Sequence, residues 1–174
     1  MKKLIALILV IAMAASLVAC GNKAADKAPL EGTMEENALK VMEIAPVEFM
    51  GGIIPVDLTD TSEDGKWAVN YFTGLSDASK ITDVAVYESM MGSQAFSLVM
   101  VRTAEGTDPK AVAEEMKSGI DPRKWICVGA DEIMAAGYGD TVMFIMLDSQ
   151  LDLKAQSYVD AFAQVAGGEL DFTI

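Results

Sequence analysis

Two pairs of apolar stretches constrain the fold of this 174-residue chain more than any other feature of its sequence. Residues 81–87 and 95–102 form the first pair, and residues 132–137 and 141–147 form the second. Short apolar runs of this kind, bounded by glycine and polar residues, predict β-strands. The connection inside each pair is too short for a crossover helix, so we expect two antiparallel hairpins.

A helix is expected after each hairpin, so that a strand–strand–helix unit occurs twice. Asp108 and Pro109 predict the start of the first helix, and Gly119 predicts its end. Apolar residues spaced three or four apart between Leu151 and Ala166 predict the second helix. The second strand of each pair is apolar on both faces. These two strands are therefore expected at the centre of the sheet, with helices covering at least one face.

Two earlier helices and an edge strand complete the predicted domain. Thr33 and Glu36 match the capping box of a helix that Pro46 stops. Ser62 or Thr61 is expected to cap a second helix over residues 63–72. The alternating residues 169–174 predict an edge strand.

Residues 34–174 are thus predicted to form a single α+β domain, an antiparallel sheet packed with helices. Gly51 and Gly52 are expected to form a turn ahead of an extended segment. Residues 20–33 are small, polar and interrupted by Pro29, which predicts a tether before the domain. Residues 1–19 are expected to form an apolar signal helix.

The N-terminal segment has the features of an export signal. Lys2 and Lys3 precede an apolar run of about 16 residues, shorter than the roughly 20 that a membrane-spanning helix needs. The run ends in LVAC at residues 17–20, which resembles the lipobox of bacterial lipoproteins at every specified position. The resemblance implies that residues 1–19 are removed as a signal peptide and that the sulfur of Cys20 carries a diacylglycerol anchor. The alternatives are an ordinary secretory signal with a chance cysteine and an uncleaved anchor.

The strands behind this lipobox are similar to a family of small Gram-positive bacterial lipoproteins known only as a domain of unknown function. The likeness covers about residues 81–162 and rests on AFSLVMV at residues 95–101 and GDTVMFIM at residues 139–146. In that family the helix after the first hairpin runs longer, whereas Gly119 and Pro122 interrupt it here. The resemblance implies an extracytoplasmic, membrane-anchored lipoprotein and supplies no catalytic residues.

The charge and the missing histidines narrow the classes of function. The chain has 26 Asp and Glu against 13 Lys and Arg, and loss of Lys2 and Lys3 with the signal leaves 11 basic residues. Such a surface repels phosphate backbones, so no nucleic-acid partner is expected. Histidine, the commonest general base and transition-metal ligand, is absent. We therefore expect a protein that is not an enzyme and uses no cofactor.

The six residues from Asp60 to Gly65 are the best candidate for a cation site. They match the first half of a calcium-binding loop, with oxygen ligands at positions 1, 3 and 5 and glycine at position 6. The twelfth position, a bidentate glutamate in such loops, is Tyr71. A solvated helix N-terminus, where Glu63 and Asp64 complement the helix dipole, is therefore the favoured interpretation. No metal site is predicted.

Three further candidates are better explained by packing than by chemistry. Cys127 lies in an apolar run with no histidine to generate a thiolate, so a buried structural thiol is favoured over a reactive one. Met143 and Met146, three residues apart on a strand, point to opposite faces and cannot share one Cu(I) ion. Trp67 and Tyr71, four apart on a helix, are expected in the core rather than in an aromatic binding platform.

The sequence therefore predicts a lipoprotein anchored through Cys20 to the extracytoplasmic face of the cell membrane. Its domain is expected to bind another envelope protein without catalysis. The alternative is an accessory lipoprotein that binds a small ligand or a cation at the acidic stretch near Asp60. A hydrolase that relies on carboxylates is disfavoured by the absence of histidine.

Overall fold

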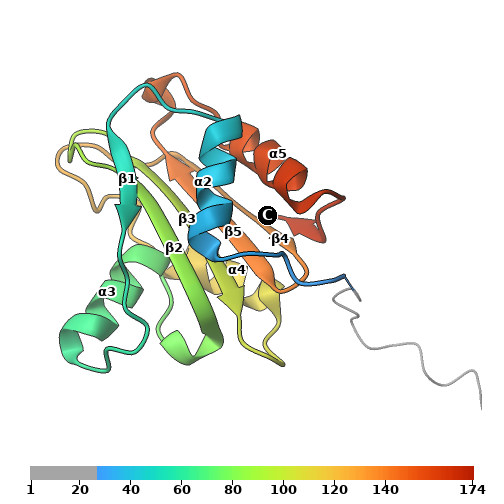
Figure 1. The fold of residues 1–174 in the computed structure, drawn as a ribbon. Helices are drawn as coiled ribbons and strands as arrows, with labels where there is room; N and C mark the ends of the chain where they lie inside the picture. Colours follow the sequence, from blue (N-terminus) through green and yellow to red (C-terminus); the bar gives the residue numbers. More distant parts are fainter. Residues whose placement is uncertain (1–26) are drawn as a thin grey trace, which may run out of the picture.

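The computed structural model describes residues 27–174. The predicted signal helix, Cys20 and the tether up to residue 26 lie outside the described residues. Six antiparallel strands form one sheet in the order β1-β2-β3-β5-β4-β6, and α-helices pack against it (Figure 1). The domain is of the predicted α+β class.

The regular elements follow the predicted order along the chain. The strands are β1 (Gly51–Ile54), β2 (Ile81–Ser89), β3 (Phe96–Thr103), β4 (Glu132–Tyr138), β5 (Thr141–Leu147) and β6 (Phe172–Thr173). The α-helices of the described part are α2 (Met34–Ile44), α3 (Glu63–Thr73), α4 (Pro109–Gly119) and α5 (Ala155–Ala166). Two short 3₁₀ helices, η1 (Ala78–Lys80) and η2 (Ser149–Leu151), complete the set.

The second strands of the two hairpins form the centre of the sheet, as predicted. β3 pairs with β2 on one side and with β5 on the other, and β5 in turn pairs with β4. All of β5 is buried, and so is all of β3 except Arg102. Apolar residues on both faces of a strand need cover on both sides, and the helices on the two faces of the sheet provide it over β3 and β5.

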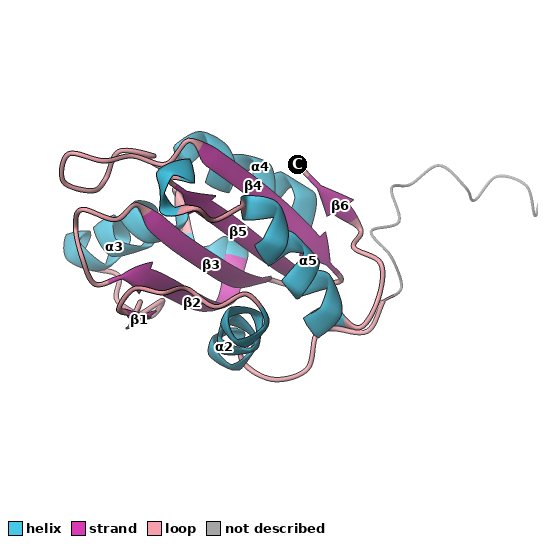
Figure 2. Cartoon of the chain, turned by 90° about the horizontal axis from the view of Figure 1, so that it is seen from above, coloured by secondary structure: helices cyan, strands magenta, loops and turns pink. Residues whose placement is uncertain are grey.

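Helices cover both faces, so the domain has three layers (Figure 2). On one face α2 lies over β2 and β3 and α5 lies over β4 and β5, around a core that contains Phe96 and Tyr158. On the other face α4 lies over β4 and β5 with α3 beside it, around Val99 and Phe144. Met143 belongs to the first core and Met146 to the second, which confirms that they point to opposite faces.

Three of the four predicted helix starts, at α2, α3 and α4, are confirmed in their local chemistry. Thr33 and Glu36 form the complete capping box of α2. The cap of α3 is Ser62, which accepts a hydrogen bond from the backbone N–H of Gly65. The predicted start of α5 at Leu151 is wrong, because residues 149–151 form the separate turn η2 and the helix begins at residue 155.

The predicted Gly51-Gly52 turn is also wrong, because both residues belong to strand β1. Gly51 pairs with Ser89 of β2, next to the ring of Tyr87. A Cβ atom on Gly51 would lie 2.6 Å from Cε1 of Tyr87. Glycine thus leaves room for the ring of Tyr87 beside the strand, a contact that a local pattern does not reveal.

Candidate functional site

The two ends of the sheet carry different chemistry. At the tether end β2 begins, β3 ends and the chain enters α2. At the distal end lie three connections, residues 45–50, 90–95 and 120–131. Backbone hydrogen bonds join these connections, from Met90 to Met50 at 2.9 Å and from Ile126 to Gly92 at 2.8 Å. Figure 1 shows the distal end at the upper left and the start of the described chain at the right.

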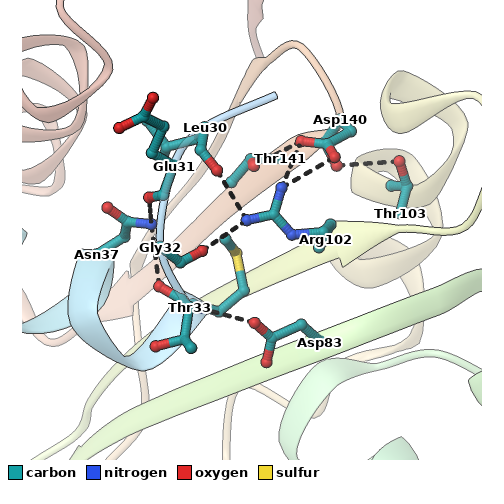
Figure 3. A network of polar contacts seen from close by, with 11 residues as sticks. Leu30, Glu31, Gly32, Thr33, Asn37, Asp83, Arg102, Thr103, Asp140 and Thr141 are labelled. Carbon is teal, nitrogen blue, oxygen red and sulfur yellow. Dashed lines mark hydrogen bonds and ion pairs between the residues drawn. The ribbon is translucent and has the colours of Figure 1, made fainter. Parts of the chain in front are cut away.

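Arg102 of β3 holds the incoming chain at the tether end. Its Nη2 donates to the carbonyl oxygens of Leu30 and Gly32, both at 2.8 Å. Its Nη1 donates to the two carboxylate oxygens of Asp140 at 3.2 and 3.0 Å. Figure 3 shows the guanidinium between the chain segment and the β4–β5 turn. Charge-assisted hydrogen bonds of this kind fix orientation as well as adding stability.

Contacts on both sides extend this arrangement. Nζ of Lys27 lies 2.7 Å from Oδ1 of Asp171 and 4.9 Å from the ring centroid of Tyr138. The backbone N–H of Met34 donates to Asp83 of β2 at 2.8 Å. Residues 27–33, which belong to the predicted tether, therefore lie against the domain.

The three distal connections expose four large apolar side chains: Met50, Met90, Met91 and Ile126 are 70%, 61%, 51% and 72% exposed. We name these four residues the distal apolar surface. A Cβ atom on Gly92 would lie 3.4 Å from Cδ1 of Ile126, so the connection after Met91 touches the segment that carries Ile126. Three segments distant in sequence thus meet at the distal end, and each of them carries an exposed apolar side chain.

A buried ion pair lies beneath this surface. The side chain of Lys124 is 1% exposed, and its Nζ lies 2.5 Å from Oε1 of Glu88. The ring centroids of Tyr71, Phe72 and Trp125 lie 5.0, 5.2 and 5.4 Å from the ammonium. Burial lowers the pKa of Lys124, and the charge of Glu88 opposes that shift. The pair and its aromatic surroundings anchor residues 120–131 to α3 and β2.

This ion pair was not predicted, because nothing local connects its two partners. Glu88 lies near the end of β2 and Lys124 lies in a segment without regular structure. Tyr71 reaches the same place by donating from its hydroxyl to the backbone carbonyl of Lys124 at 3.2 Å. The only sequence signal is that Lys124 directly precedes Trp125 in an apolar run. This position indicates that the lysine lies close to the core, but it does not identify a partner for its charge.

The prediction that Cys127 is buried is wrong. Cys127 is exposed and has a φ of +64°, a backbone conformation that suits a tight irregular turn. Residues 120–131 form no strand, so burial does not follow the apolar run: Lys124 turns inward and Ile126 turns outward. Cys127 borders an open cavity of about 700 Å³. Arg123, Asp131 and Asp148 contribute to the same cavity.

The prediction of core packing is wrong for Trp67, which is 60% exposed. Its ring stacks on that of Tyr71 with centroids 4.7 Å apart. Tyr71 packs over the Lys124 ammonium. Trp67, one turn earlier on α3, lies beyond the part of the helix that residues 120–131 cover. Sequence spacing correctly placed the two rings together, whereas their burial depended on what α3 packs against.

The acidic stretch from Asp60 to Gly65 forms the start of α3, as predicted. Oδ1 of Asp60 accepts from the backbone N–H of Ser62 at 2.9 Å, and hydrogen bonds with Ser62 hold the pKa of Asp60 below its usual value. Glu63 and Asp64 lie in the first turn of the helix. A Cβ atom on Gly65 would lie 2.3 Å from the backbone oxygen of Asp60, which explains this glycine without a cation.

A cavity of about 430 Å³ opens beside this stretch. Its polar lining includes Asp60, Lys66 and Asp77. Ser79 donates to both carboxylate oxygens of Asp77 at 2.8 Å, from its backbone N–H and its hydroxyl. Within residues 27–174, no group of three or more Cys, Asp or Glu side chains is arranged to hold a metal ion.

No family model, curated protein or solved structure matches this chain. The likeness to small Gram-positive lipoproteins therefore stays a prediction from the sequence. None of the helices in residues 27–174 combines the length and the apolar character needed to cross a bilayer.

Proposed function

We propose that this protein is a lipid-anchored, extracytoplasmic binding protein, whose domain holds another envelope protein without catalysing a reaction. The distal apolar surface carries the proposal. Single exposed apolar side chains are ordinary on soluble domains. Four of them, brought together from three segments, are typical of a surface that meets a partner.

The way the chain joins the domain supports this role. Only seven residues, 20–26, connect the proposed anchor at Cys20 to the docked segment that starts at Lys27. Fully extended, they span at most about 25 Å. The Arg102 contacts keep the tether end close to the anchor, so the distal apolar surface faces away from the membrane, toward other envelope proteins.

A small-ligand or cation-binding role near Asp60 is the second candidate, and the cavity beside the start of α3 favours it. The carboxylates of Asp60 and Asp77 already accept hydrogen bonds from Ser62 and Ser79, which reduces their capacity for an added cation. A thermal shift with a panel of cations and metabolites tests this candidate. A shift that Asp60→Asn abolishes would support it over the protein-binding role.

Site-specific photocrosslinking on intact cells tests the protein-binding role. A photoreactive amino acid replaces Met90 in the full chain, and a matched variant carries it at Leu39, an exposed apolar residue in the middle of α2. We expect a discrete protein adduct from position 90 and none from position 39. Equal adducts from both positions, or none from either, would contradict the proposal.

Metabolic labelling with a fatty acid tests the anchor separately. The wild-type chain is expected to incorporate label and to sediment with membranes. Cys20→Ser is expected to lose both properties while the domain formed by residues 27–174, which does not include Cys20, stays folded. Equal labelling of the two chains would refute lipidation at Cys20.

A further inference from the structure

The rim of the distal apolar surface is acidic. Glu43 and Glu48 are exposed where the chain passes from α2 toward Met50, and Asp121 and Asp131 are exposed at the two ends of the segment that carries Ile126. No ion pair within residues 27–174 uses any of these four carboxylates. Asp131 accepts hydrogen bonds from Ser149 and Asp121 accepts one from the backbone N–H of Arg123, but these neutral donors do not cancel the charge. Four carboxylates without a cationic partner leave the rim with a negative field.

The basic residues of this region do little to neutralise the rim. Lys124 is buried against Glu88, and Lys154 pairs with Glu132 at 2.8 Å. Arg123 is exposed and stands among the acids. The distal end therefore combines an apolar centre with an excess of negative charge around it.

Methionine makes up three of the four residues of the distal apolar surface. Its unbranched, polarizable side chain adapts to irregular apolar shapes and recurs on surfaces that receive amphipathic helices. Such a surface suits a row of apolar side chains on one face of a helix, rather than one rigid small molecule.

The charge of the rim also distinguishes between the possible binding partners of this surface. Two copies of this chain would bring identical acidic rims together, and like charges across an interface cost several kcal/mol. An anionic bilayer would be repelled for the same reason. A segment with apolar residues on one face and lysine or arginine beside them complements both the centre and the rim.

We infer that the distal apolar surface binds a basic amphipathic helical segment of the partner protein. The inference rests on the proposed function, because it names the chemistry of the partner at that same surface. Apolar contacts hold the segment at Met50, Met90, Met91 and Ile126, while the acidic rim orients it and accelerates its association.

A synthetic peptide of leucine and lysine, about 14 residues or four helical turns long, serves as the probe. Its binding to the full chain carrying Cys20→Ser is measured by fluorescence anisotropy. The same peptide with glutamate in place of lysine is the charge control, and a scrambled peptide without an apolar face is the pattern control. We expect binding of the first peptide alone, weakened by added salt.

Matched variants locate the binding on the molecule. Glu43→Lys with Glu48→Lys is expected to weaken binding about 10-fold, the effect of about 1.4 kcal/mol. The control, Glu35→Lys with Glu105→Lys, changes the net charge equally but at the tether end. Met90→Gln with Met91→Gln is expected to weaken binding to a similar degree, and Leu39→Gln is expected to leave it unchanged.

Equal weakening by the rim variant and its charge-matched control would overturn the inference, because binding would then follow net charge alone. Binding of the glutamate peptide would overturn it as well. Self-association that Met90→Gln abolishes would assign the surface to a second copy instead. If position 90 crosslinks to a protein on cells while the lysine peptide fails to bind, the proposed function stands and this inference fails.

Discussion

At the tether end the cation of Arg102 faces the chain and binds its backbone, whereas at the distal end the cation of Lys124 is enclosed by aromatic rings. Arg102 satisfies two carbonyl groups and the carboxylate of Asp140. Lys124 forms an ion pair with Glu88 inside the domain. The charged side chain thus lies at the surface at the tether end and in the interior at the distal end.

This difference explains why apolar side chains gather at the distal end. A segment such as residues 120–131 ordinarily turns its lysine toward water and its isoleucine toward the core. Here Lys124 occupies the interior position and Ile126 the exterior one. A buried ion pair is an expensive way to anchor a loop. The exchange of the two positions leaves Ile126 exposed on the distal apolar surface.

The largest expected effect comes from breaking the distal ion pair. Lys124→Met leaves the carboxylate of Glu88 buried without a partner, so the free energy of unfolding should fall by about 3–5 kcal/mol. Urea denaturation measures the change. Lys66→Met, which removes an exposed pair with Glu63, should leave the free energy of unfolding unchanged within error.

A second substitution separates the charge from the packing. Adding Glu88→Gln to Lys124→Met should recover part of the lost stability, since the uncompensated charge is then gone. If the single variant is as stable as the wild type, the pair does not anchor residues 120–131 and the contrast between the two ends fails.

The next largest effect is expected at the tether end. Arg102→Leu removes the hydrogen bonds to Leu30, Gly32 and Asp140 and should lower the free energy of unfolding by about 2–3 kcal/mol. Amide hydrogen exchange should rise in residues 27–33 and stay unchanged in residues 120–131. Increased exchange in both segments would show that the two ends are not independent.

Substitutions on the distal apolar surface should barely change stability. Met90→Gln and Met91→Gln alter exposed side chains, so the free energy of unfolding should stay within about 0.5 kcal/mol of the wild type. Thermal denaturation provides the measurement. A large loss would mean that these residues belong to the core and would remove the basis for a docking surface.

Acid is expected to act on both ends alike. The hydrogen bond from Lys80 holds the pKa of Glu115 below its usual value, and the one from Lys154 does so for Glu132. The unfolded chain therefore binds more protons, and these contributions, complete above about pH 4.3, are lost as the pH falls further. Unfolding midpoints measured at a series of acid pH values should fall less steeply for Glu115→Gln and for Glu132→Gln. Unchanged slopes would exclude these carboxylates as a cause of acid sensitivity.

Much of the fold could be predicted because the signals are local. The two-faced apolar runs of β3 and β5 require cover on both sides, and that requirement places them at the centre of the sheet. Thr33 and Glu36 begin α2 through hydrogen bonds that span three residues. The helix dipole favours Glu63 and Asp64 in the first turn of α3, which is also a local effect.

Most of the failed predictions concern contacts between segments distant in sequence, whereas the start of α5 failed locally because Asp148 caps the separate turn η2. Gly51 looked like a turn residue until Tyr87 of the neighbouring strand was placed beside it. Cys127 and Trp67 have apolar neighbours in sequence, but their exposure depends on how residues 120–131 pack against α3. Burial outside regular elements has no period that a sequence displays.

Short-range patterns alone were enough for the α+β class, the two hairpins and the predicted lipid attachment at Cys20. Each depends on hydrophobic alternation, capping or a motif read within a few residues. The clamp at Arg102, the Lys124–Glu88 pair and the distal apolar surface required the assembled domain. Pairing β2 with β3 and packing residues 120–131 on α3 bring charges and apolar side chains together across long stretches of chain, and no local propensity encodes such distances.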